Sequence, residues 1–149
     1  MSGSRRLDHR VQEVRHVAVL EFPDRKVGDF YKILGFDEVV HREDPPREYI
    51  EALTGGNLAD LKIRKVANRH NQILEILSLP YVNVLTSGPW NHFAVTVTDC
   101  NLIIEQLTLA DGFVVGGPVA SPDGPFLVAY VRDASGNLVE IVEQRVGSE

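Results

Sequence analysis

The feature that most constrains the fold of this chain is an internal repeat. The stretch RHVAVLEF (Arg15–Phe22) aligns with NHFAVTVT (Asn91–Thr98), which places His16 on His92. Near the end of each half, QILEIL aligns with NLVEIV, which places Glu75 on Glu140. Self-similarity of this kind indicates two copies of one supersecondary unit.

Each copy continues from its histidine-bearing strand into a helical pattern. The first pattern, KVGDFYKILGF, has Val27, Phe30, Tyr31 and Leu34 on one face. The second, NLIIEQLTLADGF, has one face formed by Leu102, Ile103, Gln106, Leu107 and Ala110. Each predicted helix stops at a glycine, Gly35 or Gly112, which fits a left-handed C-terminal cap.

The remaining segments of each copy read as strands. The alternation of apolar and polar residues predicts strands over residues 14–22, 37–43, 60–67 and 72–79 in the first copy, and over 90–98, 113–120, 126–132 and 137–143 in the second. Residues 44–57 are extra in the first copy, and the segment 47–53 within them predicts one or two helical turns. We expect a flexible N-terminal segment over 1–13 and two modules, 14–80 and 90–145, within one domain overall.

Composition restricts the partners and the compartment. The net charge of −6 argues against nucleic acid or an anionic membrane as the main partner, and no apolar run reaches membrane-spanning length. The single cysteine, Cys100, excludes a disulfide framework and a thiolate metal cluster. These features fit a cytoplasmic protein with a small-molecule ligand.

The repeated histidines and glutamates predict a metal site. A carboxylate on an apolar strand face is costly to bury unless it is paired, and both glutamates lie on such faces. If the copies pack with pseudo-twofold symmetry, each contributes one imidazole and one carboxylate to a shared concave site. This ligand set suits Zn²⁺, Ni²⁺, Co²⁺, Mn²⁺ or Fe²⁺. Such an ion polarises a carbonyl, and a nearby carboxylate can move a proton.

A simpler interpretation stands beside this one. A single histidine on a strand is more often a core or rim residue than a metal ligand, and a glutamate on a final strand usually faces water. Four such residues at matching positions of two copies favour the metal site. The other histidines, His9, His41 and His70, have no counterpart in the other copy and are interpreted as surface residues.

The segments RHVAVLEFPDRKVGDFYKILGF, LEIL, NHFAVTVTD and VAYVRDASGNLVEIVE resemble the vicinal oxygen chelate superfamily, which includes glyoxalase I and methylmalonyl-CoA epimerase. The resemblance covers nearly the whole chain from about Val14. The closing turn usually reads Asp-Pro-Asp-Gly-Asn in this superfamily, and here it is Asp133-Ala134-Ser135-Gly136-Asn137.

The resemblance implies an α+β fold in which two βαβββ modules form a half-open barrel around one divalent metal ion. It implies the ligands His16, Glu75, His92 and Glu140, with Glu75 and Glu140 as candidate catalytic bases. The glutamate at position 75 is similar to the residue at the matching position of glyoxalase I-like members, while the loop before the third strand is similar to the matching loop of epimerase-like members. The implied function is a lyase or isomerase that enolises a small carbonyl substrate. A homodimer is also implied, with the site within one chain or between two.

Other functions remain open from the sequence. One alternative is a metal-independent module that binds a small molecule or antibiotic, as in bleomycin-resistance proteins. Others are a dioxygenase or a fosfomycin-type transferase of the same superfamily. Lys62 and Arg64 share a strand face, where they would grip an anionic substrate or, as we favour, face solvent while Leu61 and Ile63 point inward.

Overall fold

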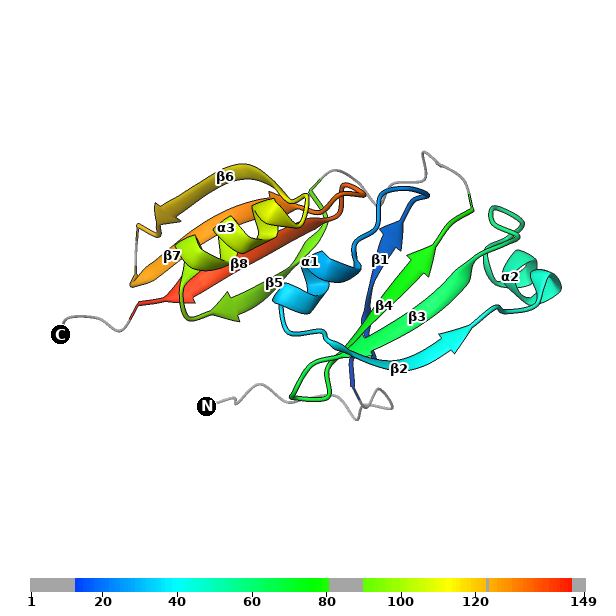
Figure 1. Cartoon of the computed structure of the whole chain (residues 1–149). Helices are drawn as coiled ribbons and strands as arrows, with labels where there is room; N and C mark the ends of the chain where they lie inside the picture. The colour runs from blue at the N-terminus through cyan, green and yellow to red at the C-terminus, as the bar shows by residue number, and fades with distance from the viewer. Residues whose placement is uncertain (1–12, 81–89, 123, 146–149) are drawn as a thin grey trace, which may run out of the picture.

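The computed structural model describes residues 13–80, 90–122 and 124–145, and these form two four-stranded sheets (Figure 1). The predicted flexible segment 1–13 lies outside the described residues except for Glu13. The first sheet has the order β1-β4-β3-β2. Its strands are β1 (Val17–Glu21), β2 (Glu38–Glu43), β3 (Lys62–Ala67) and β4 (Ile73–Ser78).

The second sheet repeats this topology with the order β5-β8-β7-β6. Its strands are β5 (His92–Val97), β6 (Phe113–Ala120), β7 (Phe126–Arg132) and β8 (Leu138–Gln144). In each sheet the first strand pairs in parallel with the last, and the other pairs are antiparallel. Both sheets are curved and open, so the predicted fold class of two βαβββ modules is confirmed.

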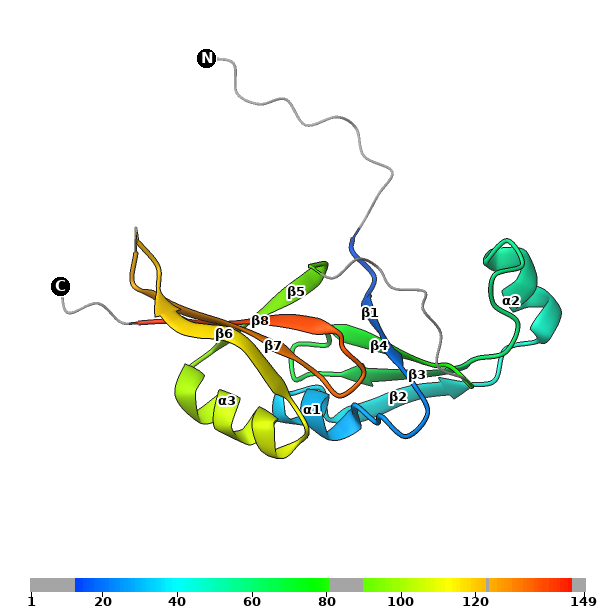
Figure 2. The same cartoon turned by 90° about the horizontal axis from the view of Figure 1, so that it is seen from above.

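One helix follows the first strand of each module. These are α1 (Gly28–Ile33) and α3 (Cys100–Leu109), and α2 (Arg47–Leu53) forms the predicted helical turns of the extra segment. Figure 2 shows α1 and α3 on the same side of the two sheets, with α2 beyond the far end of the first sheet. We call the face of each sheet that α1 and α3 do not cover the open face.

The two helices end in different ways. Gly35 follows α1 with φ +96°, the left-handed conformation that the sequence predicts. After α3 the left-handed residue is Asp111, with φ +65°, so the prediction for Gly112 is wrong. Gly112 is needed for space, because a Cβ there would lie 2.6 Å from the Leu107 carbonyl oxygen.

The main core lies between the helices and the covered faces of both sheets. Strand residues alternate, so that one set faces the helices and the other faces the open side. Phe30 and Tyr31 of α1 and Leu107 of α3 are fully buried there, whereas Leu102 and Gln106, predicted on the same face as Leu107, are exposed. A smaller cluster places Ile50 of α2 against Leu79 and Leu61 at one end of the first sheet.

Charged side chains on the covered faces hold the helices in place. Glu21 of β1 is buried, accepts hydrogen bonds from Val27 N (2.9 Å) and Ser78 Oγ (2.8 Å), and lies 3.6 Å from the Arg64 guanidinium. Arg64 therefore points toward the helix side and serves the fold, which corrects its prediction as a solvent-facing residue. In the second module, Glu143 accepts from Cys100 N at the start of α3 (2.7 Å).

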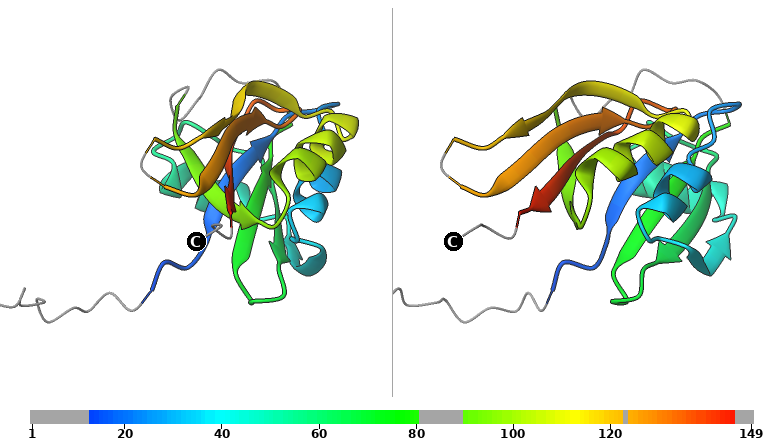
Figure 3. Two further views of the ribbon diagram at one scale, coloured as in Figure 1. Left: turned by 90° about the vertical axis from the view of Figure 1, so that its left-hand side faces the viewer. Right: turned by 60° about the vertical axis from the view of Figure 1, so that its left-hand side comes forward.

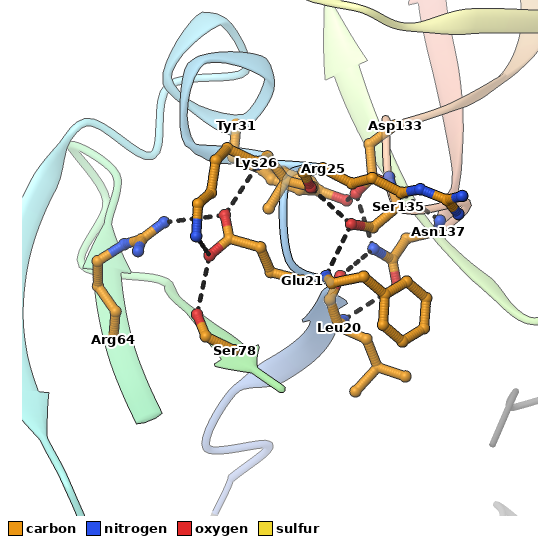
Figure 4. A network of polar contacts seen from close by, with 12 residues as sticks. Leu20, Glu21, Arg25, Lys26, Tyr31, Arg64, Ser78, Asp133, Ser135 and Asn137 are labelled. Carbon is orange, nitrogen blue, oxygen red and sulfur yellow. Dashed lines mark hydrogen bonds and ion pairs between the residues drawn. The ribbon is translucent and has the colours of Figure 1, made fainter. Parts of the chain in front are cut away.

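The helices α1 and α3 contact each other where the two modules meet, and the turn between β7 and β8 ties the modules together. Asn137 in this turn donates from Nδ2 to Leu20 O (2.7 Å) and accepts from Leu20 N at Oδ1 (3.1 Å). Ser135 Oγ accepts from Phe22 N (3.0 Å) and donates to Arg25 O (2.7 Å). Figure 4 shows these contacts, which we call the inter-module clasp, here defined as the contacts of residues 133–137 with the first module.

A buried hydrogen bond between the two modules also belongs to the inter-module clasp. Tyr31 of α1 donates its hydroxyl to Asp133 Oδ2 (2.7 Å), and both residues are buried. Burial raises the pKa of the Asp133 carboxyl, while hydrogen bonds donated by Tyr31, Asn137 and Ser135 oppose that rise. Burial also raises the pKa of the Tyr31 hydroxyl well above its ordinary value, and the neighbouring Asp133 adds to the effect.

Figure 3 gives two further views of this arrangement, in which α1 and α3 lie together beside the sheets. Within the described part of the chain, none of the helices has the length and apolar character needed to cross a membrane.

Candidate metal centre

The second module brings His92 and Glu140 together on its open face. His92 begins β5 and Glu140 lies in β8, two positions further along the parallel pair, because His92 is in register with Leu138 and Ala94 with Glu140. The small Ala94 side chain leaves the imidazole room to turn toward the carboxylate. His92 Nε2 lies 3.1 Å from Glu140 Oε1, and the side chains are 28% and 25% exposed.

Both ring nitrogens of His92 face acceptors. Nδ1 lies 2.8 Å from the Trp90 carbonyl oxygen, and Nε2 lies 3.1 Å from Glu140 Oε1. A neutral imidazole has one N–H and can donate to only one of these oxygens. With that hydrogen on Nδ1, a cation held between Nε2 and Oε1 would satisfy both atoms.

The first module forms an equivalent pair from His16 and Glu75. His16 directly precedes β1, and Glu75 lies in β4 in register with Ala18. His16 Nε2 lies 3.4 Å from Glu75 Oε1, and Glu75 is the less exposed of the two, at 14%. His16 Nδ1 is buried and has no hydrogen-bond partner among the described residues. A buried imidazole nitrogen left unsatisfied costs stability unless another group meets it.

Both spacings match those of two neighbouring ligands on one ion. Ligand atoms about 2.1 Å from an ion lie roughly 3.0 Å apart at a right angle and roughly 3.4 Å apart at the tetrahedral angle. The observed separations are 3.1 Å for His92 with Glu140 and 3.4 Å for His16 with Glu75. Each pair therefore fits a divalent ion as half of a ligand set.

The two pairs stay separate within one chain. Among residues 13–80, 90–122 and 124–145, no three side chains of the types His, Cys, Asp and Glu lie close enough together to hold one ion. The structure thus brings the four predicted ligands together two by two, on the open faces of different sheets. A hollow of about 940 Å³ lies between the modules and is lined in part by His16, Ala94 and Thr96.

The residues beside the two pairs differ. Tyr130 of β7 is in register with Glu140, and its ring meets that of His92 edge-on at a centroid distance of 5.0 Å. Trp90 lies 6.4 Å from the Tyr130 ring and stacks under the Arg132 guanidinium at 5.8 Å. Tyr130, Trp90 and Arg132 thus form a largely aromatic surface beside the second pair.

Beside the first pair, the position that corresponds to Tyr130 is occupied by a lysine. Lys65 of β3 is in register with Glu75, and its Nζ lies 3.9 Å from Glu75 Oε2. Lys65 was not among the candidates predicted from the sequence, which on this strand were Lys62 and Arg64. The signal was present, because alternation along β3 places Lys65 on the side opposite to Arg64 and, through the sheet register, beside Glu75.

Cys100, a nucleophile by residue type, does not belong to this site. Its side chain is fully buried at the start of α3, in the main core. Burial raises the pKa of its thiol, and the charges of Glu143 and Asp99 raise it further. A thiol held in its neutral form inside a core is a packing group.

Comparison with known proteins identifies the fold. No family model matches the chain, and no curated protein matches its sequence. Among solved structures, a glyoxalase family protein from Bacillus cereus superposes with a TM-score of 0.76 at 16% identity, covering 95% of this chain and 99% of that one. A glyoxalase family protein from Enterococcus faecalis gives 0.65 at 20% identity, covering 89% and 98%.

A third neighbour holds a metal ion. The fosfomycin resistance protein FosX from Listeria monocytogenes, solved in complex with Mn(II) and a sulfate ion, gives a TM-score of 0.60 at 12% identity, covering 91% of this chain and 95% of that one. These matches confirm the resemblance seen in the sequence at the level of the fold: the chain has the fold of the vicinal oxygen chelate superfamily.

Proposed function

We propose that this protein is a divalent-metal-dependent lyase or isomerase of the glyoxalase I or epimerase type, acting on a small carbonyl substrate. The observation that carries the proposal is the pair of matched His–Glu contacts, each at a ligand-to-ligand spacing. The orientation of His92 supports it, because Trp90 O holds Nδ1 and leaves Nε2 aimed at Glu140. The Mn(II) bound by FosX, which shares the fold, adds support.

The residues that would hold the ion are His16, Glu75, His92 and Glu140. When bound, Zn²⁺, Ni²⁺, Co²⁺, Mn²⁺ or Fe²⁺ supplies a Lewis acid for two neighbouring substrate oxygens. Glu75 and Glu140 would serve as bases that take a proton from the carbon beside the carbonyl and return it to the product. Small side chains on the open face of β5, Ala94 and Thr96, leave space for a substrate beside these carboxylates.

We further propose that two copies of the chain form the complete site. The pairs do not meet within the described chain, and both lie on open faces that α1 and α3 leave uncovered. In a twofold dimer the first-module pair of one copy would face the second-module pair of the other, which gives two equivalent sites. We propose the cytoplasm as the compartment, because the only cysteine is a buried free thiol.

Elemental analysis and a substrate screen test this function. We expect about one divalent ion per chain after purification, and turnover of a 2-oxo thiohemiacetal or an acyl-CoA ester that a chelator abolishes. We expect Glu140→Gln to abolish that turnover. Full metal content and full turnover in Glu140→Gln would remove Glu140 from its assigned role.

The second candidate is a metal-independent module that binds a small molecule. The aromatic surface of Trp90 and Tyr130 on the open face favours it, since such surfaces bind planar ligands without an ion. Ligand binding that is unchanged by a chelator, in a protein that carries no metal, would support this candidate over the enzyme.

A further inference from the structure

The His16–Glu75 pair and the His92–Glu140 pair, which we call the two half-sites, lie in modules of the same topology. They differ in the residue that lies beside the glutamate. Lys65 and Tyr130 each lie on the third strand of a module, in register with the glutamate of the neighbouring strand. Tyr130 makes ring contacts with His92 and Trp90. Lys65 instead reaches toward Glu75 Oε2 at 3.9 Å. A site assembled from both halves therefore carries an ammonium on one side and an aromatic surface on the other.

The position of Lys65 is not explained by the packing of the sheet. It is 26% exposed on the open face, whose β4 residues beside Glu75 are Ile73 and Leu77. A partly exposed ion pair at this distance contributes little stability. The other basic side chain of β3 with a defined partner, Arg64, turns to the helix side and pairs with buried Glu21.

When a divalent ion is bound, charge balance leaves Lys65 able to attract an anion. The positive charge of a divalent ion is matched by the carboxylates of Glu75 and Glu140, so sharing Glu75 with the ion leaves the Lys65 ammonium without full compensation. An ammonium on a face of low polarity favours an added anion, because the interaction is stronger where water is partly excluded. A lysine serves this purpose as a compact point charge with several donors.

We propose that Lys65 binds an anionic oxygen group of the substrate, a carboxylate or a phosphonate, and so sets both the substrate class and its orientation. The charged end of the substrate lies beside Lys65 of the first module, and the uncharged part of the substrate lies over Tyr130 and Trp90 of the second module. This inference rests on the proposed function for the identity of the site, but the role of Lys65 is measurable as binding alone.

The test uses the full chain, titrated calorimetrically with pyruvate and with methylphosphonate, each with and without Mn²⁺. Pyruvate represents the carboxylate and methylphosphonate the phosphonate, so the tighter ligand identifies the anion. Lys65→Met should weaken binding of that ligand at least tenfold, and Lys65→Arg should restore it to within about threefold. Lys62→Met, on the other face of the same strand, should change binding less than twofold.

The outcomes separate the two proposals. Equal binding by Lys65→Met and the unchanged protein, at equal Mn²⁺ content, overturns the role of Lys65 and leaves the metal centre standing. Binding that depends on Lys65 but needs no metal, in a protein that takes up no Mn²⁺, supports the anion site and contradicts the metal enzyme. Absence of binding of both anions by the unchanged protein overturns the inference.

Discussion

Asn137 pairs with the main chain of Leu20 as a neighbouring strand would, donating to its carbonyl at 2.7 Å and accepting from its N–H at 3.1 Å. Leu20 lies in β1, an edge strand, whose backbone groups on this side have no strand partner. One side chain thus closes the edge of the first sheet and connects it to the second. His16 directly precedes β1, and Glu140 lies in β8, which begins directly after Asn137. The contact between Asn137 and Leu20 therefore also sets the position of the His16–Glu75 pair relative to the His92–Glu140 pair.

Replacing Asn137 with alanine should destabilise the protein by about 2–4 kcal/mol. The change removes both bonds to Leu20 and the bond from Nδ2 to Asp133, and it leaves partly buried backbone groups unsatisfied. Urea unfolding at neutral pH measures the effect. Asn101→Ala on the exposed surface of α3 is the control and should stay within about 0.5 kcal/mol of the unchanged protein. Equal stabilities of the two variants would contradict the role of the clasp.

The contact between Tyr31 and Asp133 predicts a loss of stability in alkali. Because burial and Asp133 raise the pKa of the folded Tyr31 hydroxyl, the folded state keeps a proton that the unfolded state releases. The stability that the Tyr31 hydroxyl contributes is therefore complete below the pKa of about 10 in the unfolded state, and it is lost as the pH rises through the raised pKa of the folded state. Tyr31→Phe should be less stable by about 1.5–3 kcal/mol at pH 7, with a gap that narrows above pH about 10.

Denaturant unfolding at several pH values between 7 and 11 checks this prediction. Tyr49→Phe is the matched control, since Tyr49 is 56% exposed, and it should show neither the loss at pH 7 nor the change with pH. A stability difference for Tyr31→Phe that is constant with pH would argue against the assigned pKa shift.

Glu21 should be a structural residue and not a catalytic one. Glu21→Ala leaves Val27 N and Ser78 Oγ without their acceptor and Arg64 without its buried partner. We expect a loss of about 3–5 kcal/mol in unfolding free energy, the usual cost of breaking a buried pair. Glu38→Ala, on the exposed β2, should cost under about 0.5 kcal/mol. If Glu21→Ala unfolds at the same urea concentration as the control, the network does not stabilise the start of α1.

Removing one carboxylate ligand should weaken metal binding while the fold persists. Changes to groups that merely orient a ligand typically cost about 10–100-fold in affinity, so Glu75→Gln and Glu140→Gln should each cost at least that much. Equilibrium dialysis against Mn²⁺ or Zn²⁺ measures the affinity, and circular dichroism checks the fold. Glu105→Gln, on the exposed surface of α3, should bind as the unchanged protein does. Retained affinity in both ligand variants would rule out these carboxylates as ligands.

Much of the fold was predictable because alternation and turn residues act locally. All eight predicted strands are present among the described residues, and Gly35 adopts its predicted conformation. The prediction for Gly112 was wrong because the neighbouring Asp111 can also adopt the left-handed conformation, and the constraint on Gly112 is a close approach that the sequence does not display.

The long-range contacts were not predictable in the same way. The bonds of Ser135 and Asn137 to the first module join residues more than 100 positions apart. In the sequence the segment 133–137 had the appearance of a hairpin turn alone. The repeat predicted that each module contributes one histidine and one glutamate. The parallel pairing of the first and last strands, which the structure shows, brings His16 beside Glu75 and His92 beside Glu140. Whether the pairs meet depends on how whole modules pack, which strand patterns do not encode.

A mixed-chain experiment tests the central claim most directly, that the four side chains of two copies hold one ion. One chain carries His16→Ala with Glu75→Ala, the other carries His92→Ala with Glu140→Ala, and each alone should bind no divalent ion. Co-expressed in equal amounts, they should regain about one quarter of the normal metal content, because about half of the dimers are mixed and each mixed dimer has one complete site. No recovery of metal in verified mixed dimers would contradict a site formed between two copies.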